Sequence, residues 1–575
     1  MFQGEDLGHA GFFLRVNALS VRRYALVANL RGKLLESVII LAARNQLSVS
    51  NFNSQMSPIH GKPALFWIID LYYKNQKVIV VINERNKLLK KYIEMTYPNV
   101  LCIIVQQDEM YKKYGQNSVL TSLSEGLQNL PPEENKIKIV LGDTYCNAIN
   151  CDFKDFILTS DGAKTSEKWC LVKRNKEGCV SEFYDKKKNI DVVDKEIVAG
   201  FYCVSDVAEL KKSLSDEIAA NNNSMSSLIM SYNKKNPVHC VKTDSWFDFG
   251  HRGGILKAQK QFYNSRNFNS IIVNDVTNIL TKRSVKKQKL SDEYLWYKEM
   301  PEGLQSFVPR VYQVRDTEEL FEIDMENYGY PPLSELWLYG EYDLDLWQLI
   351  TKKLVDIRLY MNNFSGTLER KNYEQLYVEK LFDRLSELKK IGSYWEKLLS
   401  EKYITVNDRK LNNLPAYENK LRAALEKIAE TANTTVMHGD YCFSNILFDT
   451  QNFVCKLIDP RGRLLEQTIY GDSRYDFAKL RHSLVGNYDY IVHGAYFFVE
   501  ENGAFTYKDG CLEDRTVLAD YFDKLLESNG YDIKEIKLIE ATLFLSMIPL
   551  HTDSFEQQKI FYIKGIQKLN ECFGE

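Results

Sequence analysis

Four short apolar runs constrain the fold of the first half of this 575-residue chain more than any other feature. They cover residues 37–43, 78–83, 100–106 and 136–141, and helical patterns at 64–74 and 87–97 lie between them. Strands that alternate with helices predict a parallel sheet with helices on both faces, and sites in such sheets lie at the carboxyl ends of the strands. We therefore expect an α/β fold in which the loop after Ala43 and the turn at Asp143 share one edge of the sheet.

The pattern changes near residue 267. Residues 268–273 and 278–282 have the pattern of two short strands around a polar turn, and beyond Gly340 the chain becomes strongly helical. Apolar residues three and four positions apart predict amphipathic helices at 345–361, 373–390 and 415–432. One hydrophobic core cannot serve so long a chain. We predict an N-terminal extension of unclear status (1–35), an α/β domain (36–266), a small strand-rich lobe (267–340) and a large helical lobe (341–575).

Charge and cysteine usage exclude several classes of protein. The 74 basic and 77 acidic residues give a net charge of −3 and form no long single-sign run, so we expect no nucleic-acid partner. The apolar runs are far shorter than the roughly 18 residues that a membrane span needs, so we expect no membrane insertion. The eleven cysteines form no Cys-x-x-Cys pair, which argues against a zinc site and fits reduced thiols in the cytoplasm. The sequence leaves open whether the chain forms a homo-oligomer.

One segment of the C-terminal half carries the residues that phosphoryl transfer requires. The reaction needs a carboxylate that orients the attacking hydroxyl and ligands that hold the metal-bound triphosphate. Protein kinases supply them from the pattern H-R-D-x-x-x-x-N and a following Asp. Here Asp440 ends a His-Gly-Asp triplet, Asn445 lies five residues later, and Asp459 follows an apolar run. A hairpin of residues 445–448 and 453–458 would bring Asn445 and Asp459 to the same end.

This arrangement resembles the aminoglycoside phosphotransferase and choline kinase superfamily over roughly residues 268–575. The resemblance implies a bilobal kinase-like fold with ATP as the phosphoryl donor. It also implies that Asp440 is the catalytic base and that Asn445 and Asp459 hold Mg²⁺. Residues 471–478 are similar to a downstream segment of the family that is chiefly structural. The alternative interpretation of the triplet is a polar turn beside a structural asparagine.

A kinase of this kind also needs a strand lysine for the α- and β-phosphates and a helix glutamate that pairs with it. Lys282 ends a predicted strand, and Glu293 lies eleven residues later in a helical segment, so we expect these two residues to form the pair. A solvated run of lysines is the alternative, because three more follow closely (Lys286, Lys287 and Lys289). The turn at 274–277 contains no glycine, so polar side chains or backbone N–H groups there would meet the phosphates.

The first half carries motifs in the order found in another family. They are the apolar run 38–43, Gly61-Lys62-Pro63, residues 118–123, Gly142-Asp143, residues 199–202 and residues 246–250. They resemble the nucleotidyltransferases that make nucleotide-activated sugars and CDP-choline, whose fold is Rossmann-like with a mixed, mostly parallel sheet. The resemblance implies that Asp143 and Asp248 bind Mg²⁺. It also implies that the base and ribose are held by Leu41, Ala42, Ala43 and Ser118.

The loop after Ala43 departs from that family. It contains no glycine in the run Arg44-Asn45-Gln46-Leu47-Ser48, and Ser54 occupies the position of a family lysine. A backbone without glycine approaches a triphosphate less closely. Arg44 and Lys62 are the cations that could compensate. The alternative is a fold retained for binding or architecture without turnover.

The two halves together predict a bifunctional cytoplasmic enzyme. We expect the kinase half to phosphorylate a hydroxyl of a small alcohol, amino alcohol or sugar with ATP. We expect the other half to couple that phosphate to a nucleotide, CMP from CTP, for a bacterial surface glycan such as capsule or lipopolysaccharide. The glycan assignment rests on analogy to fused and neighbouring enzymes of the two families. The main alternative is an active kinase with a regulatory or structural N-terminal half, and an antibiotic-modifying kinase is a further one.

Overall fold

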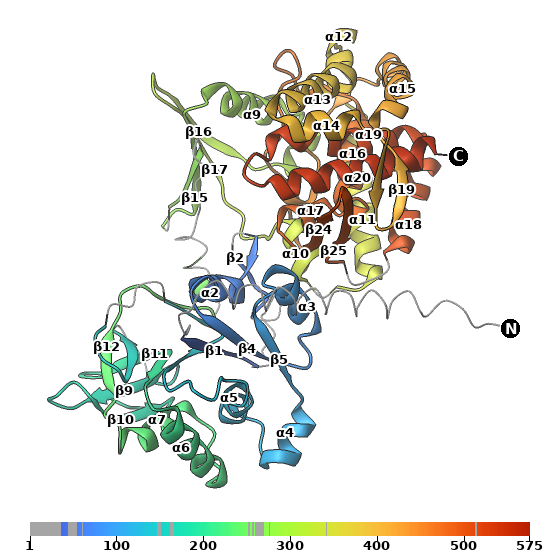
Figure 1. Ribbon diagram of the computed structural model, residues 1–575. Helices are drawn as coiled ribbons and strands as arrows, with labels where there is room; N and C mark the ends of the chain where they lie inside the picture. The colour runs from blue at the N-terminus through green and yellow to red at the C-terminus, as the bar shows by residue number, and fades with distance from the viewer. Residues whose placement is uncertain are drawn as a thin grey trace. The chain divides into compact units, whose positions relative to one another are not determined.

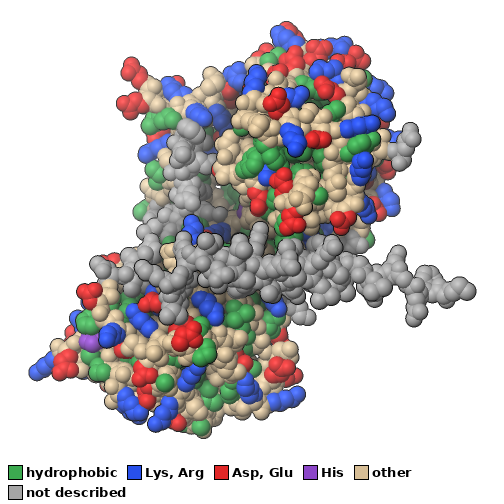
Figure 2. All heavy atoms as spheres, viewed as in Figure 1, with side chains coloured by type: hydrophobic (Ala, Val, Ile, Leu, Met, Phe, Trp, Pro, Cys, Tyr) green, Lys and Arg blue, Asp and Glu red, His purple; other side chains and the backbone are tan. Residues whose placement is uncertain are grey.

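The computed structural model divides the chain into two compact units, Met1–Phe262 and Tyr263–Glu575 (Figure 1). It describes residues 36–43, 55–59, 61–146, 151–161, 166–250, 254–255, 258, 269–274, 276–340, 342–511 and 515–574. The predicted extension 1–35 and the predicted boundary between residues 266 and 267 lie outside these ranges. Figure 2 shows basic and acidic side chains interspersed over the visible face of both units, in keeping with the small net charge.

A mixed sheet forms the centre of the first unit. Its main path runs β10 (Val180–Asp185), β9 (Cys170–Arg174), β11 (Glu196–Val204), β6 (Ile137–Leu141), β1 (Ser37–Ala42), β4 (Lys77–Asn83) and β5 (Leu101–Val105). Two further strands, β8 (Phe156–Ser160) and β12 (His239–Lys242), extend it from β11. Strands β6, β1, β4 and β5 are the four predicted apolar runs, and they pair in parallel. The α/β prediction is confirmed at this level, whereas the assignment to the nucleotidyltransferase fold stays a prediction.

Helices cover both faces of the parallel strands, which explains why those strands are apolar on both sides. In Figure 1, α2 (Ala64–Tyr72) and α3 (Lys87–Thr96) lie on one side and α5 (Val119–Leu127) on the other. A Cβ on Gly126 of α5 would lie 2.8 Å from the side chain of Ile39 and 3.3 Å from that of Val81, so the helix packs closely on this face. The rest of the unit comprises β2 (Pro58–Ile59), β3 (Lys62–Pro63), α4 (Gln107–Tyr114), β7 (Thr144–Cys146), α6 (Val207–Ala219), α7 (Met225–Asn233) and β13 (Trp246–Asp248).

The second unit begins with a small antiparallel sheet and one helix. The strand order is β14 (Asn269–Val273), β15 (Ile279–Ser284), β17 (Phe321–Glu326) and β16 (Val311–Asp316). The helix is α9 (Lys287–Glu299), which packs on β17 and contacts β15 and β16. The central position of β15 fixes Lys282, whose register partners are Ile271 and Ile323.

The rest of this unit is mainly helical. Its helices are α10 (Leu333–Tyr339), α11 (Leu344–Met361), α12 (Arg370–Glu374), α13 (Lys380–Ile391), α14 (Ser393–Ser400), α15 (Glu418–Glu430), α16 (Ser473–Leu484), α17 (Tyr488–Val492), α18 (Thr516–Ser528), α19 (Ile533–Met547) and α20 (Phe555–Phe573). Its strands are β18 (Tyr403–Val406), β19 (Arg409–Asn412), β20 (Thr435–Val436), β21 (Ile446–Asp449), β22 (Val454–Leu457), β23 (Tyr470–Gly471), β24 (Tyr496–Glu501) and β25 (Ala504–Asp509). The predicted hairpin is the antiparallel pair β21 and β22.

Two predicted helices differ in detail. The segment 373–390 is interrupted by a π-helical turn, Gln375–Glu379, between α12 and α13. Pro415 lies in a separate 3₁₀ turn, Leu414–Ala416, and α15 begins only at Glu418. Within the described ranges, every helix is too short or too polar to cross a membrane.

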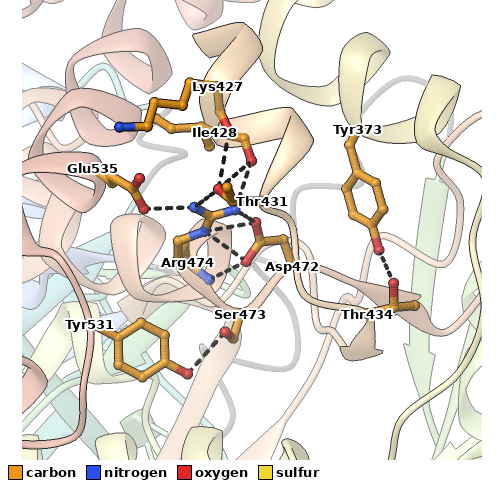
Figure 3. Close-up of polar contacts among 10 residues, drawn as sticks. All are labelled: Tyr373, Lys427, Ile428, Thr431, Thr434, Asp472, Ser473, Arg474, Tyr531 and Glu535. Carbon is orange, nitrogen blue, oxygen red and sulfur yellow. Dashed lines mark hydrogen bonds and ion pairs between the residues drawn. The ribbon is translucent and has the colours of Figure 1, made fainter. Parts of the chain in front are cut away.

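A polar cluster fixes the start of α16, which carries several residues of the site (Figure 3). The Arg474 guanidinium lies between two carboxylates, 2.6 Å from Asp472 and 2.6 Å from Glu535. It also donates to the Ile428 carbonyl oxygen at 2.8 Å. Asp472 is the N-cap of α16 and accepts a hydrogen bond from the Arg474 backbone N–H at 3.0 Å. The start of α16 is therefore held by a hydrogen bond to α15 and an ion pair to α19.

Candidate active site

Lys282 and Glu293 form the ion pair that the sequence predicts between a strand and a helix. The Lys282 Nζ atom lies 2.6 Å from Glu293 Oε1, and it also pairs with Asp459 Oδ1. Burial alone would lower the pKa of Lys282, but Asp459 and Glu293 raise it by more, so the ammonium stays charged. Strand β15, helix α9 and the loop after β22 thus meet at one cation.

Asp440 has a partner at each carboxylate oxygen. Its Oδ1 atom lies 2.9 Å from the Nζ atom of Lys479, and its Oδ2 atom accepts a hydrogen bond of 2.8 Å from Asn445 Nδ2. Burial alone would raise the pKa of Asp440, but Lys479, His438 and Asn445 lower it by more, so the pKa lies below its usual value. Asp440 is therefore ionised at neutral pH, as a proton acceptor must be.

Asp476 holds the backbone of the loop that carries Asp440. It accepts hydrogen bonds from the backbone N–H groups of His438 at 3.0 Å and Gly439 at 2.8 Å. Its carboxylate also pairs with Arg358 at 2.9 Å, and both side chains are fully buried. Gly439 has a φ of +77°, and a Cβ there would lie only 2.6 Å from the Cβ atom of Arg461. Glycine is required at this position on both counts.

His438 joins the Asp440 loop to the Asp459 loop. Its Nδ1 atom accepts from the Asp440 backbone N–H at 3.3 Å, and its Nε2 atom lies 3.0 Å from the Ile458 carbonyl oxygen. Burial lowers the pKa of His438, so the ring is neutral and its proton is on Nε2, which donates to Ile458.

Asp459 adopts a left-handed backbone conformation, with a φ of +55°. Such a conformation costs on the order of 1–3 kcal/mol for a residue other than glycine and persists where surrounding contacts impose it. Here the Asp459 N–H donates to Tyr297 Oη at 3.2 Å, and the Tyr297 hydroxyl donates to Glu293 at 3.3 Å. Helix α9 therefore positions both Asp459 and the partner of Lys282.

Asn445 and Asp459 fit the requirements of a magnesium site. Nδ2 of Asn445 donates to both Asp440 Oδ2 and the Asp440 carbonyl oxygen, which leaves the amide oxygen for another partner. An amide oxygen and a carboxylate are oxygen ligands, and Mg²⁺ usually takes only one or two carboxylates besides phosphates and waters. The described residues contain no group of three or more His, Cys, Asp and Glu suited to a metal.

In the first unit, Asp143 and Asp248 converge. A Cβ on Gly250 would lie 2.6 Å from Asp143 Oδ2 and 3.0 Å from Asp248 Oδ1, so both oxygens lie near one point. The pairing of β7 with β13 sets this approach, because Asp248 is opposite Thr144. Two such carboxylates suit a divalent cation.

The other residues predicted for this unit are placed less uniformly. The Gly142 N–H donates to the Leu41 carbonyl oxygen at 2.8 Å, so Leu41, Ala42 and Ala43 lie beside the Asp143 turn. Ser118 caps α5 through the Thr121 N–H at 3.4 Å. Lys62 pairs with Asp70 and lies over the Trp67 ring at 4.6 Å. The predicted cation Arg44 and the position Ser54 lie outside the described residues.

Sequence reasoning missed Lys479. It is the residue after the matched segment 471–478, and it lies three positions after Asp476 on the same side of α16. That spacing was the available signal, because residues three and four apart share a helix face.

The comparisons with known proteins come only from solved structures, since no protein-family model and no curated protein matches the chain. An apo thermostable mutant of aminoglycoside phosphotransferase APH(4)-Ia is 12% identical, with 54% of this chain and 94% of that chain covered and a TM-score of 0.35. A putative fructosamine-3-kinase from Haemophilus somnus 129PT is 11% identical, with coverage of 53% and 90% and a TM-score of 0.33. An aminoglycoside-3'-phosphotransferase of type VIII is 15% identical, with coverage of 54% and 97% and a TM-score of 0.25. We therefore base the function on the geometry of this chain's own residues.

Proposed function

We propose that the C-terminal unit is a kinase that transfers the γ-phosphoryl group of ATP to a hydroxyl of a small molecule. The observation that carries the proposal is the convergence of Asp440, Asn445 and Asp459 with the Lys282–Glu293 pair. A phosphoryl-transfer site needs these parts: a hydroxyl-orienting carboxylate, metal ligands and a strand lysine paired with a helix glutamate.

Each residue has a role in that reaction. Asp440 accepts the proton of the acceptor hydroxyl as its oxygen forms a bond to the γ-phosphorus, while the bond to the ADP oxygen breaks. Lys282 binds the α- and β-phosphates, and Glu293 holds the lysine in place. Asn445 and Asp459 would hold Mg²⁺, which neutralises charge on the phosphates.

The test is an acceptor screen with a chemically matched null variant. The full chain is incubated with Mg·ATP and panels of alcohols, amino alcohols and sugars, and ADP and phosphorylated products are identified by mass. We expect acceptor-dependent ADP release from the wild type and a loss of ~10²–10⁴-fold in Asp440→Asn, the range for a lost general base. An Asp440→Asn enzyme with wild-type turnover would contradict the proposal.

We further propose that the first unit couples the phosphorylated product to a nucleotide, CMP from CTP. The observation that favours this function is the approach of Asp143 and Asp248, since one metal between two carboxylates can stabilise charge at an α-phosphate. Such an activated product would serve a surface glycan such as capsule or lipopolysaccharide. The competing function is a regulatory or structural domain, which the glycine-poor loop at 44–48 favours.

Pyrophosphate release separates the two alternatives. With CTP and a phosphorylated acceptor, Asp143→Ala should abolish pyrophosphate release and leave ADP production intact. Gly250→Ala should have a similar effect, because its Cβ would displace both carboxylates. If no NTP yields pyrophosphate with any product of the kinase unit, the first unit is not a transferase.

A further inference from the structure

A group of cations lies beside Asp440 on the second unit. Lys380 and Arg384 lie one turn apart on α13, Tyr475 and Lys479 lie one turn apart on α16, and Arg461 follows β22. We call Lys380, Arg384 and Arg461 the basic triad. Lys380 Nζ donates to Tyr475 Oη at 2.8 Å, which joins the two helices.

Arg461 connects the basic triad to the loop that carries Asp440. Its side chain packs against Gly439, the residue before Asp440, since a Cβ on Gly439 would lie 3.2 Å from Arg461 Cδ. Its backbone N–H donates to the His438 carbonyl oxygen at 2.9 Å. The Arg461 side chain therefore lies beside the residue that precedes Asp440. In the sequence, Arg461 follows Asp459 by two residues.

The basic triad lacks carboxylate partners within the described part of the chain. Lys380 bonds to a phenol, Arg384 donates to the Ser546 carbonyl oxygen at 2.7 Å, and neither forms an ion pair there. Arg461 likewise forms no ion pair with a described residue. Glu387, which acts on Arg384 electrostatically, is exposed on the same helix. Partly buried cations without a counter-charge are costly, so three of them in one place indicate a site for an anion.

A cavity extends this basic surface. Arg461 also lines a cavity of about 570 Å³ together with Lys286, Lys287, Lys289 and Arg463. Asp292 is the acidic residue among those that line the cavity, and its carboxylate forms an ion pair with Arg463 at 2.7 Å. The volume lies within the range of roughly 300–1,000 Å³ for small-molecule sites.

The ionisation of the neighbouring groups agrees with a positive potential. Burial is the main cause that lowers the pKa of Lys380 to about 8, and Arg461 and Arg384 lower it further. Burial alone would raise the pKa of Tyr475, but Lys380, Lys479 and Arg461 outweigh it and lower the pKa to about 8.

We propose that the acceptor of the kinase unit is an anion, a hydroxyl compound that also bears a phosphate or carboxylate, and that the basic triad binds this negative group. The inference rests on the proposed kinase function and adds the substrate class. Neutral and cationic alcohols lack the group that the triad would bind, and the arginines would repel a cation. A bound phosphate or carboxylate receives charge-assisted hydrogen bonds from the guanidinium groups.

The test measures ligand binding to the full chain with Mg·AMP-PNP at saturation, so that the nucleotide phosphates already occupy their own site. The probes are glycerol, glycerol 3-phosphate, glycerate and choline at constant ionic strength, and the readout is the melting midpoint. We expect the two anions to raise the midpoint more than glycerol or choline does. If the anions raise it no more than glycerol does, the inference is wrong.

Variants of the triad supply the second arm. Arg384→Gln, Lys380→Gln and Arg461→Gln should each weaken anion binding by about tenfold or more, the loss expected for a charge-assisted hydrogen bond. The matched control is Lys389→Gln, which removes one charge from the far, exposed side of α13 and should bind as the wild type does. Unchanged anion affinity in all three triad variants would overturn the inference. A missing Mg·AMP-PNP shift in the wild type would instead contradict the kinase function.

Discussion

Lys479 and Asp440 form an ion pair in the second unit, with 2.9 Å between Nζ and Oδ1. The lysine comes from α16, and the polar cluster around Arg474 fixes the start of that helix (Figure 3). A helix held in this way presents a cation to one oxygen of the Asp440 carboxylate, and Asn445 donates a hydrogen bond to the other. The ionisation of Asp440 therefore depends on the placement of a neighbouring helix.

Substituting Lys479 should change the pH profile. Lys479 lowers the pKa of Asp440, so Lys479→Met should raise that pKa and shift the acid limb of acceptor-dependent ADP release to higher pH. Lys479→Arg keeps the positive charge, so its acid limb should stay at the pH of the wild type. The measurement is the rate under saturating ATP across the pH range. An acid limb that stays in place in Lys479→Met would exclude this role.

Asp459→Ala should weaken the binding of Mg·ATP itself, because it removes a proposed metal ligand and a partner of Lys282. A tenfold loss of affinity would remove about 1.4 kcal/mol of ligand-induced stabilisation. The readout is the rise in melting midpoint with Mg·ATP, compared with ATP in EDTA. Asp345→Ala, on the exposed first turn of α11, is the control and should show the wild-type rise. An unchanged rise in Asp459→Ala would show that Asp459 holds no metal.

Asp476→Ala should cost about 3–5 kcal/mol of unfolding free energy, because it leaves Arg358 as an uncompensated buried charge. It also removes the acceptor for the backbone N–H groups of His438 and Gly439. Urea denaturation measures the change. The control is Asp356→Ala, which breaks an exposed pair with Lys352 one turn away and should cost under about 0.5 kcal/mol. Equal losses of unfolding free energy in the two variants would mean that the buried pair stabilises the fold no more than the exposed pair does.

Anion binding should weaken as the pH rises through about 8. Below that value Lys380 is protonated and Tyr475 is neutral, and near it this hydrogen-bonded pair loses one proton, from either group, and with it one positive charge. The loss of one positive charge from the pair opposes the binding of an anion. Titrating glycerol 3-phosphate at pH 7 and pH 9 tests the direction. Tyr475→Phe should make anion binding depend less on pH. Tighter binding of glycerol 3-phosphate at pH 9 than at pH 7 by the wild type would contradict the prediction.

The strands of the first unit were predictable because their signal is local. Runs such as 78–83 are buried on both faces and therefore apolar throughout, and the structure places β4 at Lys77–Asn83. The triplet containing Asp440 was likewise visible, since the spacing from Asp440 to Asn445 is short. The approach of Asp143 and Asp248 was expected only by resemblance, because a pairing across a hundred residues leaves no periodic trace.

The basic triad could not be predicted in the same way. Lys380 and Arg461 are 81 residues apart in the chain, and only the fold brings their charges to one tyrosine. Taken alone, Lys380 would be interpreted as a surface lysine and Arg461 as an exposed arginine in a loop. The evidence for an anion site is the lack of carboxylate partners for the basic triad among the described residues. That lack becomes visible only when segments far apart in the sequence are packed together.

The π-helical turn at Gln375–Glu379 has a consequence for the length of the segment between α12 and α13. A π turn holds one more residue than the α-helical path around it. Deleting one residue there would therefore restore the α-helical path and leave the facing of α13 relative to α12 unchanged. Leu381, Leu385 and Leu388 would stay in the core, and Lys380 would stay beside Tyr475. The same deletion inside α13 would instead turn the residues after it by about 100°. The π turn is thus a place where a single codon could be lost without moving the side chains of either helix.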